Sequence, residues 1–257
     1  MDWDTFNKLR VILANEGWDY VYMYLSGEPL LHPHYWEMLL AMSHSGIVTD
    51  TASKLCFPID WSSAAVTLGE LYAKTHFDIT IDAHTQELQD KVSVGINNAQ
   101  VFDNLSALAK LRSPKVSVSV ITVRNAYNQG HLDAIRKRVE ACGISRWTHK
   151  PMGYYMGYLL TPEDEAMMAE LAPKNSPRFS VQKGHVVSNM TSCSHFLKPV
   201  IGVTGDVTVC CHDMLFKEAQ WNVLTAGSLD KIVNSPSYRA TRSKGGTMSL
   251  SICQGCN

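Results

Sequence analysis

The sequence KVSVSVITV occupies residues 115–123 and contains the clearest strand signal of the chain. Ser117 and Ser119 alternate with valines there, which is typical of a strand with one polar and one apolar side. Similar strand patterns are expected at residues 20–25, 46–51, 76–82 and 145–150. Apolar residues at helical spacing separate these segments, and helices are expected at residues 3–16, 34–44, 61–74, 98–112 and 130–142.

Strands that alternate with helices in this way build a parallel sheet, because right-handed crossovers return each strand to the same direction. The pattern predicts an α/β fold with five parallel strands between residues 20 and 150. Ligands of such sheets bind at the C-terminal ends of the strands. The residues that follow each expected strand are therefore the first candidates for a binding site.

The composition is that of an ordinary globular chain. It has 257 residues, of which 45% are hydrophobic and 18% charged, so a sizeable core can be buried. The formal net charge of -1 gives no reason to expect nucleic acid as a partner. No stretch approaches the roughly 20 apolar residues of a membrane span, and the first residues lack an apolar secretion signal. We therefore expect a cytoplasmic protein with no membrane partner and with reduced cysteines.

Cysteines gather towards the C-terminus, where five of the seven occupy positions 193, 210, 211, 253 and 256. Residues 199–203 and 206–210 are expected to form a hairpin that turns at Thr204-Gly205 and delivers Cys210. A tight turn would deliver Cys253 and Cys256 together. With Cys193, these thiolates suit Zn²⁺ or an iron–sulfur cluster. The alternative is a set of unrelated buried cysteines, and Cys211 is expected to point away from the site.

The composition changes after the last expected parallel strand. Residues 161–178 contain three prolines and are expected to form a short acidic helix and a linker. Short strands, a helical pattern at residues 228–243 and the clustered cysteines follow. We therefore expect a (β/α) domain over residues 1–160, the linker over residues 161–178 and a small metal-binding module over residues 179–257.

Two segments resemble a known family. SGEPLLHP, residues 26–33, follows an expected strand and resembles the glycine–glutamate–proline motif of radical S-adenosylmethionine (radical SAM) enzymes. The cysteine spacing resembles the auxiliary-cluster module of the SPASM and twitch subfamilies, and its single CxxC is similar to the shorter, single-cluster twitch form. The resemblance implies a partial (β/α) barrel of parallel strands, followed by an iron–sulfur module with a β-hairpin.

The resemblance also implies two cofactors. One is an auxiliary [4Fe–4S] cluster, whose ligands would be Cys193, Cys210, Cys253 and Cys256. The other is S-adenosylmethionine (SAM), bound at the strand ends. Its amino group would face backbone atoms of the turn made by Ser26, Gly27, Glu28 and Pro29. The rest of SAM would be contacted by Asp50, Thr80, Asp82 and Arg124.

These assignments have alternatives. Asp50, Thr80 and Asp82 are equally well explained as ordinary turn-capping residues. Arg124 would meet either the carboxylate of SAM or the substrate. The turn at Ser26 departs slightly from the family, which usually has glycine at this position.

One part of the family pattern is missing. The family holds its catalytic cluster with a CxxxCxxC motif upstream of the glycine–glutamate–proline motif, whereas this sequence has no CxxxCxxC and no cysteine before Cys56. Five sheet strands are expected where the family barrel has six. We therefore expect an N-terminally truncated or split relative, in which an upstream segment or a second chain supplies three cysteines. The chain alone is not expected to cleave SAM.

For function, the resemblance implies hydrogen abstraction by a 5′-deoxyadenosyl radical, leading to oxidation or modification of a small molecule or peptide. It also implies an electron donor such as flavodoxin or ferredoxin. Because the catalytic motif is absent, a second interpretation is a non-catalytic iron–sulfur module that acts in electron transfer or substrate recognition. A third is a zinc-stabilised module in which the cysteines are purely structural.

Overall fold

The computed structural model describes residues 1–111, 113–152, 198–213 and 215–246, with shorter pieces at residues 166, 169–170, 179–182, 185–188 and 250. The chain divides into two compact units. The barrel unit comprises Asp19–Met152, and the module unit comprises Met1–Trp18 together with Gly153–Asn257. Each unit is described by itself.

The barrel unit contains a five-stranded parallel sheet with the strands in sequence order. The strands are β1 (Tyr20–Tyr22), β2 (Val48–Ser53), β3 (Thr75–Thr80), β4 (Val116–Arg124) and β5 (Trp147–Pro151). The helical elements between them are η1 (Pro29–Leu31), α2 (Tyr35–His44), α3 (Trp61–Gly69), α4 (Gln86–Val92), α5 (Asn98–Lys110) and α6 (Leu132–Ala141). The predicted α/β fold with five parallel strands is confirmed.

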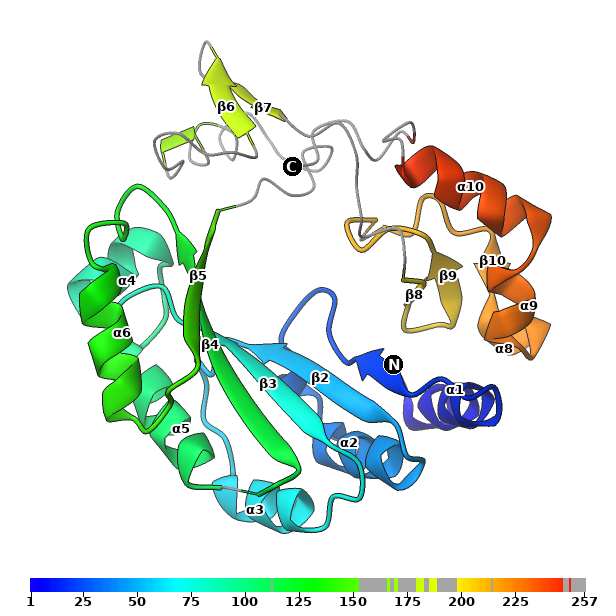
Figure 1. Cartoon of the computed structure of the whole chain (residues 1–257), viewed down its shortest axis with the longest axis horizontal. Helices are drawn as coiled ribbons and strands as arrows, with labels where there is room; N and C mark the ends of the chain where they lie inside the picture. Colours follow the sequence, from blue (N-terminus) through cyan, green and yellow to red (C-terminus); the bar gives the residue numbers. More distant parts are fainter. Residues whose placement is uncertain are drawn as a thin grey trace. The chain divides into compact units, whose positions relative to one another are not determined.

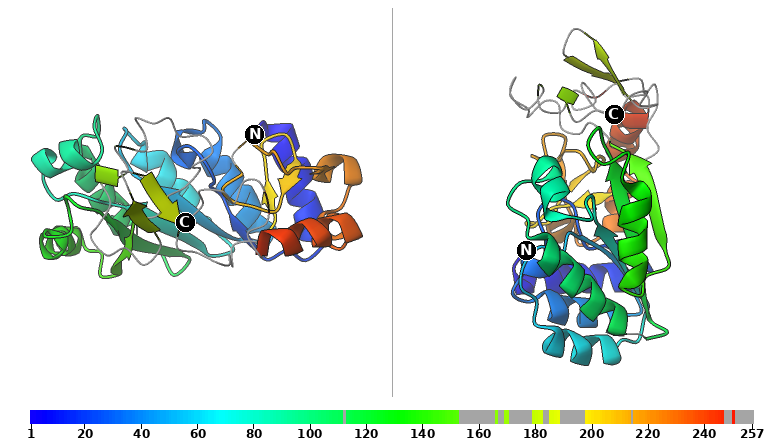
Figure 2. Two further views of the ribbon diagram at one scale, coloured as in Figure 1. Left: turned by 90° about the horizontal axis from the view of Figure 1, so that it is seen from above. Right: turned by 90° about the vertical axis from the view of Figure 1, so that its left-hand side faces the viewer.

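The sheet is curved, and α2, α3, α5 and α6 lie along its convex face (Figure 1; Figure 2). Alternation along β3 explains this arrangement. Phe77 and Ile79 are fully buried and join the apolar core with Leu105 of α5. His76 and Asp78 alternate with them along the strand and therefore occupy the opposite, concave face. The helices bury the apolar face, and the concave face remains polar.

Several element boundaries differ from the sequence-based prediction. The strand expected at residues 20–25 ends at Tyr22, and the chain then bends through Gly27, whose φ of +84° favours glycine. The helix expected at residues 61–74 ends at Gly69. Helix α4 was not predicted, because its sequence QELQDKV has almost no apolar periodicity; Thr85 caps its N-terminus through a bond from Leu88 N.

The module unit begins with α1 (Trp3–Asn15) and contains a three-stranded antiparallel sheet. Its strands are β8 (Val200–Ile201), β9 (Asp206–Thr208) and β10 (Trp221–Asn222), and a separate hairpin is formed by β6 (Phe179–Gln182) and β7 (His185–Ser188). The remaining helices are α8 (Val223–Ala226), α9 (Leu229–Val233) and α10 (Pro236–Gly246). No helix among the described residues of either unit is both long and apolar enough to cross a membrane.

The predicted hairpin around Thr204-Gly205 is present as β8 and β9. Gly205 has a φ of +87°, and a Cβ at this position would lie 2.8 Å from Cγ of Leu224, so only glycine fits the turn. The helix expected at residues 228–243 is interrupted. Pro236 cannot donate a backbone hydrogen bond inside a helix, so it begins α10 after α9 has ended at Val233.

Helix α1 lies beside α8 and α9 within the module unit (Figure 1; Figure 2). The Glu16 carboxylate follows α1 and accepts hydrogen bonds from Leu229 N at 3.1 Å and Asp230 N at 3.0 Å, which are donors of the first turn of α9. These donors have no partners inside their own helix. Glu16 therefore joins the start of the chain to the module.

We predict that Glu16→Ala lowers the free energy of unfolding by about 1–2 kcal/mol, because it leaves two helix N-terminal donors without their carboxylate. Urea unfolding followed by circular dichroism measures the change. Glu70→Ala is the matched control, since Glu70 is exposed, and its effect should stay within about 0.5 kcal/mol. Equal effects of the two substitutions would contradict the role of Glu16.

Candidate functional site

The turn after β1 carries the glycine–glutamate–proline motif. Ser26 and Gly27 are exposed, so their backbone is accessible to a ligand. The Glu28 carboxylate is used by the fold: Oε2 accepts from Lys54 N at 2.9 Å, and Oε1 accepts from Leu30 N at 3.4 Å. Pro29 follows and begins η1. Glu28 thus ties the turn after β1 to the segment after β2, which fixes two neighbouring strand ends.

Asp82 follows β3 and is also held by the neighbouring strand. Its Oδ1 accepts a bond from Val123 N at 2.7 Å. Burial raises the pKa of the Asp82 carboxyl, whereas the Val123 N–H and the charges of Lys54 and Lys150 lower it. Two lysines therefore lie close enough to act on this carboxyl, and the strand ends carry both signs of charge.

Thr80 and Arg124 are the last residues of β3 and β4, so both lie at strand ends. By strand alternation, Arg124 shares the helix-covered side of the sheet with Val120 and Thr122. Its Nε is buried and has no hydrogen-bond partner among the residues that the structure describes. A buried donor of this kind is costly unless something accepts its hydrogen bond. An anionic group such as the carboxylate of SAM fits this requirement.

We expected Asp50 at the end of a strand, and this prediction is wrong. β2 extends from Val48 to Ser53, so Asp50 lies within the strand opposite His76 of β3. It is 5% exposed, and its Oδ2 accepts the hydroxyl of Tyr20 at 3.0 Å. Burial, together with the hydrogen bond and charge of Asp50, raises the pKa of the Tyr20 hydroxyl. Asp50 therefore belongs to the concave face of the sheet.

Cys210 lies in a turn two residues beyond β9 and is 4% exposed. The backbone N–H of His212 donates to its Sγ at 3.3 Å. Such N–H to sulfur bonds are a common feature of iron–sulfur ligands and help to set their potential. A buried sulfur that already receives a backbone donor fits a thiolate ligand better than an ordinary packed cysteine.

Asp213 organises the turn that carries Cys210. Its side chain is fully buried and accepts bonds from Thr208 Oγ1 at 2.8 Å, Lys217 N at 2.7 Å and Glu218 N at 2.9 Å. Its own N–H donates to the Cys210 carbonyl at 3.1 Å. The carboxylate therefore closes the loop on both sides of Cys210 and holds it in one conformation.

The other predicted cluster ligands, Cys193, Cys253 and Cys256, lie outside the described residues. Cys211 is half-buried in the same turn as Cys210, beyond the end of the strand. Among the residues described, no group of three or more His, Cys, Asp or Glu side chains could hold a metal ion. The structure therefore describes one of the predicted ligands and the loop that supports it.

Comparisons with known proteins give one family match and several similar structures. Residues 193–257 match the SPASM family, described as an iron-sulfur cluster-binding domain. The chain is similar to the structure of anSMEcpe with bound AdoMet, with 14% identity, a TM-score of 0.63, and coverage of 94% of this chain and 73% of that one. It is also similar to BtrN in complex with AdoMet and 2-DOIA, with 14% identity, a TM-score of 0.55, and coverage of 100% and 80%. No curated protein matches the sequence.

These comparisons show the fold of the chain, which is that of the partial barrels of radical SAM enzymes, and a match of its C-terminal residues to an iron-sulfur cluster-binding domain. More particularly, residues 193–257 match the SPASM iron-sulfur cluster-binding domain, and all of the predicted cluster ligands lie within this range. The partial-barrel fold and the module inferred from the motifs are both confirmed.

Sequence reasoning missed the side chains that support the candidate sites. Asp213 was not identified, because its main partners are backbone donors four and five residues away and no motif marks them. His76 and Asp78 were not identified either. Their signal was present in HFDITID, residues 76–82, where a polar residue recurs at every second position of a strand.

We predict that Asp213→Ala lowers the free energy of unfolding by about 2–3 kcal/mol, since it leaves two backbone donors and a buried hydroxyl without their charged acceptor. Limited proteolysis should then cleave the chain between residues 208 and 218, and mass spectrometry of the fragments locates the cleavage site. Asp103→Ala, at an exposed position of α5, is the control and should alter neither measurement. An Asp213→Ala protein as stable and as resistant as the parent would show that the loop is held by other contacts.

Proposed function

We propose that the chain is a SAM-dependent radical protein that binds SAM at the C-terminal edge of the sheet and one auxiliary [4Fe–4S] cluster in its SPASM module. The observation that carries the proposal is the SPASM match over residues 193–257, which contains Cys193, Cys210, Cys253 and Cys256. The buried sulfur of Cys210, with its backbone donor from His212, supports the role of a thiolate ligand.

Different residues at the strand ends would contact different parts of SAM. The accessible backbone of Ser26 and Gly27 suits the amino group, and the buried Nε of Arg124 suits the carboxylate. Thr80 and Asp82 offer a hydroxyl and a carboxylate oxygen for the ribose. When bound, SAM and a reduced catalytic cluster supply a hydrogen-abstracting radical. The protein would orient a small-molecule or peptide substrate towards it and exclude water.

The catalytic cluster needs cysteines that this sequence does not contain in a CxxxCxxC arrangement. We infer that an upstream segment or a second chain supplies them, with flavodoxin or ferredoxin as the electron donor. The same absence favours one alternative: a non-catalytic module that binds a cluster, or zinc, and acts in electron transfer or substrate recognition.

Anaerobic reconstitution tests the auxiliary cluster. We predict a brown protein with about four irons per chain, which is the content of one [4Fe–4S] cluster. The double substitution Cys253→Ala and Cys256→Ala should remove the visible absorbance and the iron, whereas Cys56→Ala should retain both. A colourless protein with one zinc would contradict the electron-transfer role and leave a structural module, because Zn²⁺ has no visible absorbance.

Calorimetric titration with SAM tests the strand-end site. We predict that Arg124→Gln weakens SAM binding about tenfold, since it removes a charge-assisted hydrogen bond from a buried donor. Arg136→Gln is the control, because Arg136 is an exposed helix residue paired with Glu140, and it should leave the affinity unchanged. Unaltered affinity of the Arg124→Gln protein would remove this residue from the site.

A further inference from the structure

Strand register arranges polar side chains of the concave face in layers. The first layer contains Asp50, His76 and Ser117, which are register partners across β2, β3 and β4. The second layer contains Asp78 and Ser119, two residues further along their strands. A strand rises about 3.3 Å per residue, so the second layer lies about 7 Å before Thr80 and the strand ends.

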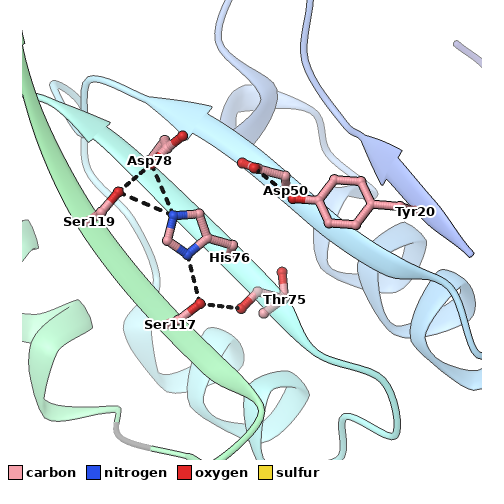
Figure 3. A network of polar contacts seen from close by, with 7 residues as sticks. All are labelled: Tyr20, Asp50, Thr75, His76, Asp78, Ser117 and Ser119. Carbon is pink, nitrogen blue, oxygen red and sulfur yellow. Dashed lines mark hydrogen bonds and ion pairs between the residues drawn. The ribbon is translucent and has the colours of Figure 1, made fainter. Parts of the chain in front are cut away.

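Hydrogen bonds join the two layers into one network (Figure 3). Ring nitrogen Nδ1 of His76 lies 2.7 Å from Ser117 Oγ, and Nε2 lies 3.0 Å from Asp78 Oδ1 and 3.1 Å from Ser119 Oγ. Ser119 also donates to Asp78 Oδ1. The hydrogen bond from His76 is the largest of the effects that lower the pKa of the Asp78 carboxyl, so this group stays ionised.

The polar network lies on the concave face of an open sheet. The inside of a closed eight-stranded barrel is filled by branched apolar side chains instead, because burying polar groups is costly. Here the apolar residues of β3 face the helices, and the side chains of His76 and Asp78 remain 20% and 24% exposed. The network is therefore only partly buried and can be reached by a small molecule.

The charges of the network favour a cation. The network has two carboxylates, Asp50 and Asp78, in its first and second layers, whereas one lysine, Lys150, lies further along beside Val123 at the strand end, and its charge also lowers the pKa of the Asp78 carboxyl. Asp78 receives its hydrogen bonds on Oδ1, so its accessible carboxylate retains Oδ2 as an acceptor for a ligand. Beside it, Ser117, Ser119 and the His76 ring carry hydrogen-bonding groups that suit a hydroxyl group.

We propose that Asp78, His76 and Ser117 form a recognition subsite for a substrate end that carries a protonated primary amine next to a hydroxyl group. The amine donates to Oδ2 of Asp78, and the hydroxyl pairs with Ser117. This inference rests on the proposed function in one respect, namely that SAM occupies the strand ends about 7 Å above Asp78. It adds the chemical class of the substrate end that points away from SAM.

The test compares two probes on the full chain without SAM. Serinol carries an amine between two hydroxymethyl groups, and glycerol has a hydroxyl in place of that amine. The histidine ring nitrogens are followed by ¹H–¹⁵N NMR during titration, with the His76 signals assigned from a His76→Gln protein. We predict a saturable shift of the His76 signals with serinol and at least about tenfold weaker binding of glycerol.

Asp78→Asn should weaken serinol binding about tenfold, because an asparagine can still bond to the His76 ring but lacks the negative charge of the carboxylate. Asp103→Asn removes an equal charge from an exposed position of α5 and should leave the affinity unchanged. The proposal is overturned if serinol does not shift His76, if glycerol binds as tightly as serinol, or if folded Asp78→Asn protein keeps the parent affinity. The comparison of probes on the parent chain needs no variant, and failure of SAM binding at Arg124 would not alter these titrations.

Discussion

The alternation of side chains along β3 and β4 is the constraint on which the barrel unit depends. It sends Phe77 and Ile79 into the helix-covered core and leaves His76 and Asp78 on the concave face. A register slip of one residue would exchange the two faces, because the period of a strand is two. The slip would bury an ionised carboxylate among apolar side chains, which costs several kcal/mol. The same pattern that builds the core therefore creates the polar face.

This constraint explains which parts of the fold the sequence could predict. Strand positions follow from local periodicity, and all five parallel strands were located from it. Boundaries depend on contacts that periodicity does not contain. Asp50 was placed at a strand end because the strand was expected to end at residue 51, yet β2 continues to Ser53. The buried Thr51 hydroxyl is satisfied by the hydroxyl of Tyr35 at 2.8 Å, a partner 16 residues away.

The candidate site was predictable only in its motifs. Cysteine spacing and the glycine–glutamate–proline turn indicated the cofactors, because those residue types have specific chemistry at fixed spacing. The supporting residues have no such signature. Glu16 caps a helix that begins more than 200 residues later, and Asp213 binds backbone donors that any sequence would provide. Their roles depend on tertiary structure, and a carboxylate at either position is otherwise an ordinary polar residue.

The acidic side chains of the barrel unit differ in whether their carboxylate oxygens bond to the backbone or remain open to a ligand. Glu28 accepts from Lys54 N, and Asp82 accepts from Val123 N, so both connect neighbouring strands at the edge where SAM is proposed to bind. Asp78, in contrast, accepts hydrogen bonds from the side chains of His76 and Ser119 among the described residues, and its side chain is 24% exposed. Carboxylates near the strand ends thus stabilise the frame of the site. In our proposals, recognition falls to the buried Arg124 Nε, which has no hydrogen-bond partner among the described residues, and to Oδ2 of Asp78, whose described hydrogen bonds are all on Oδ1.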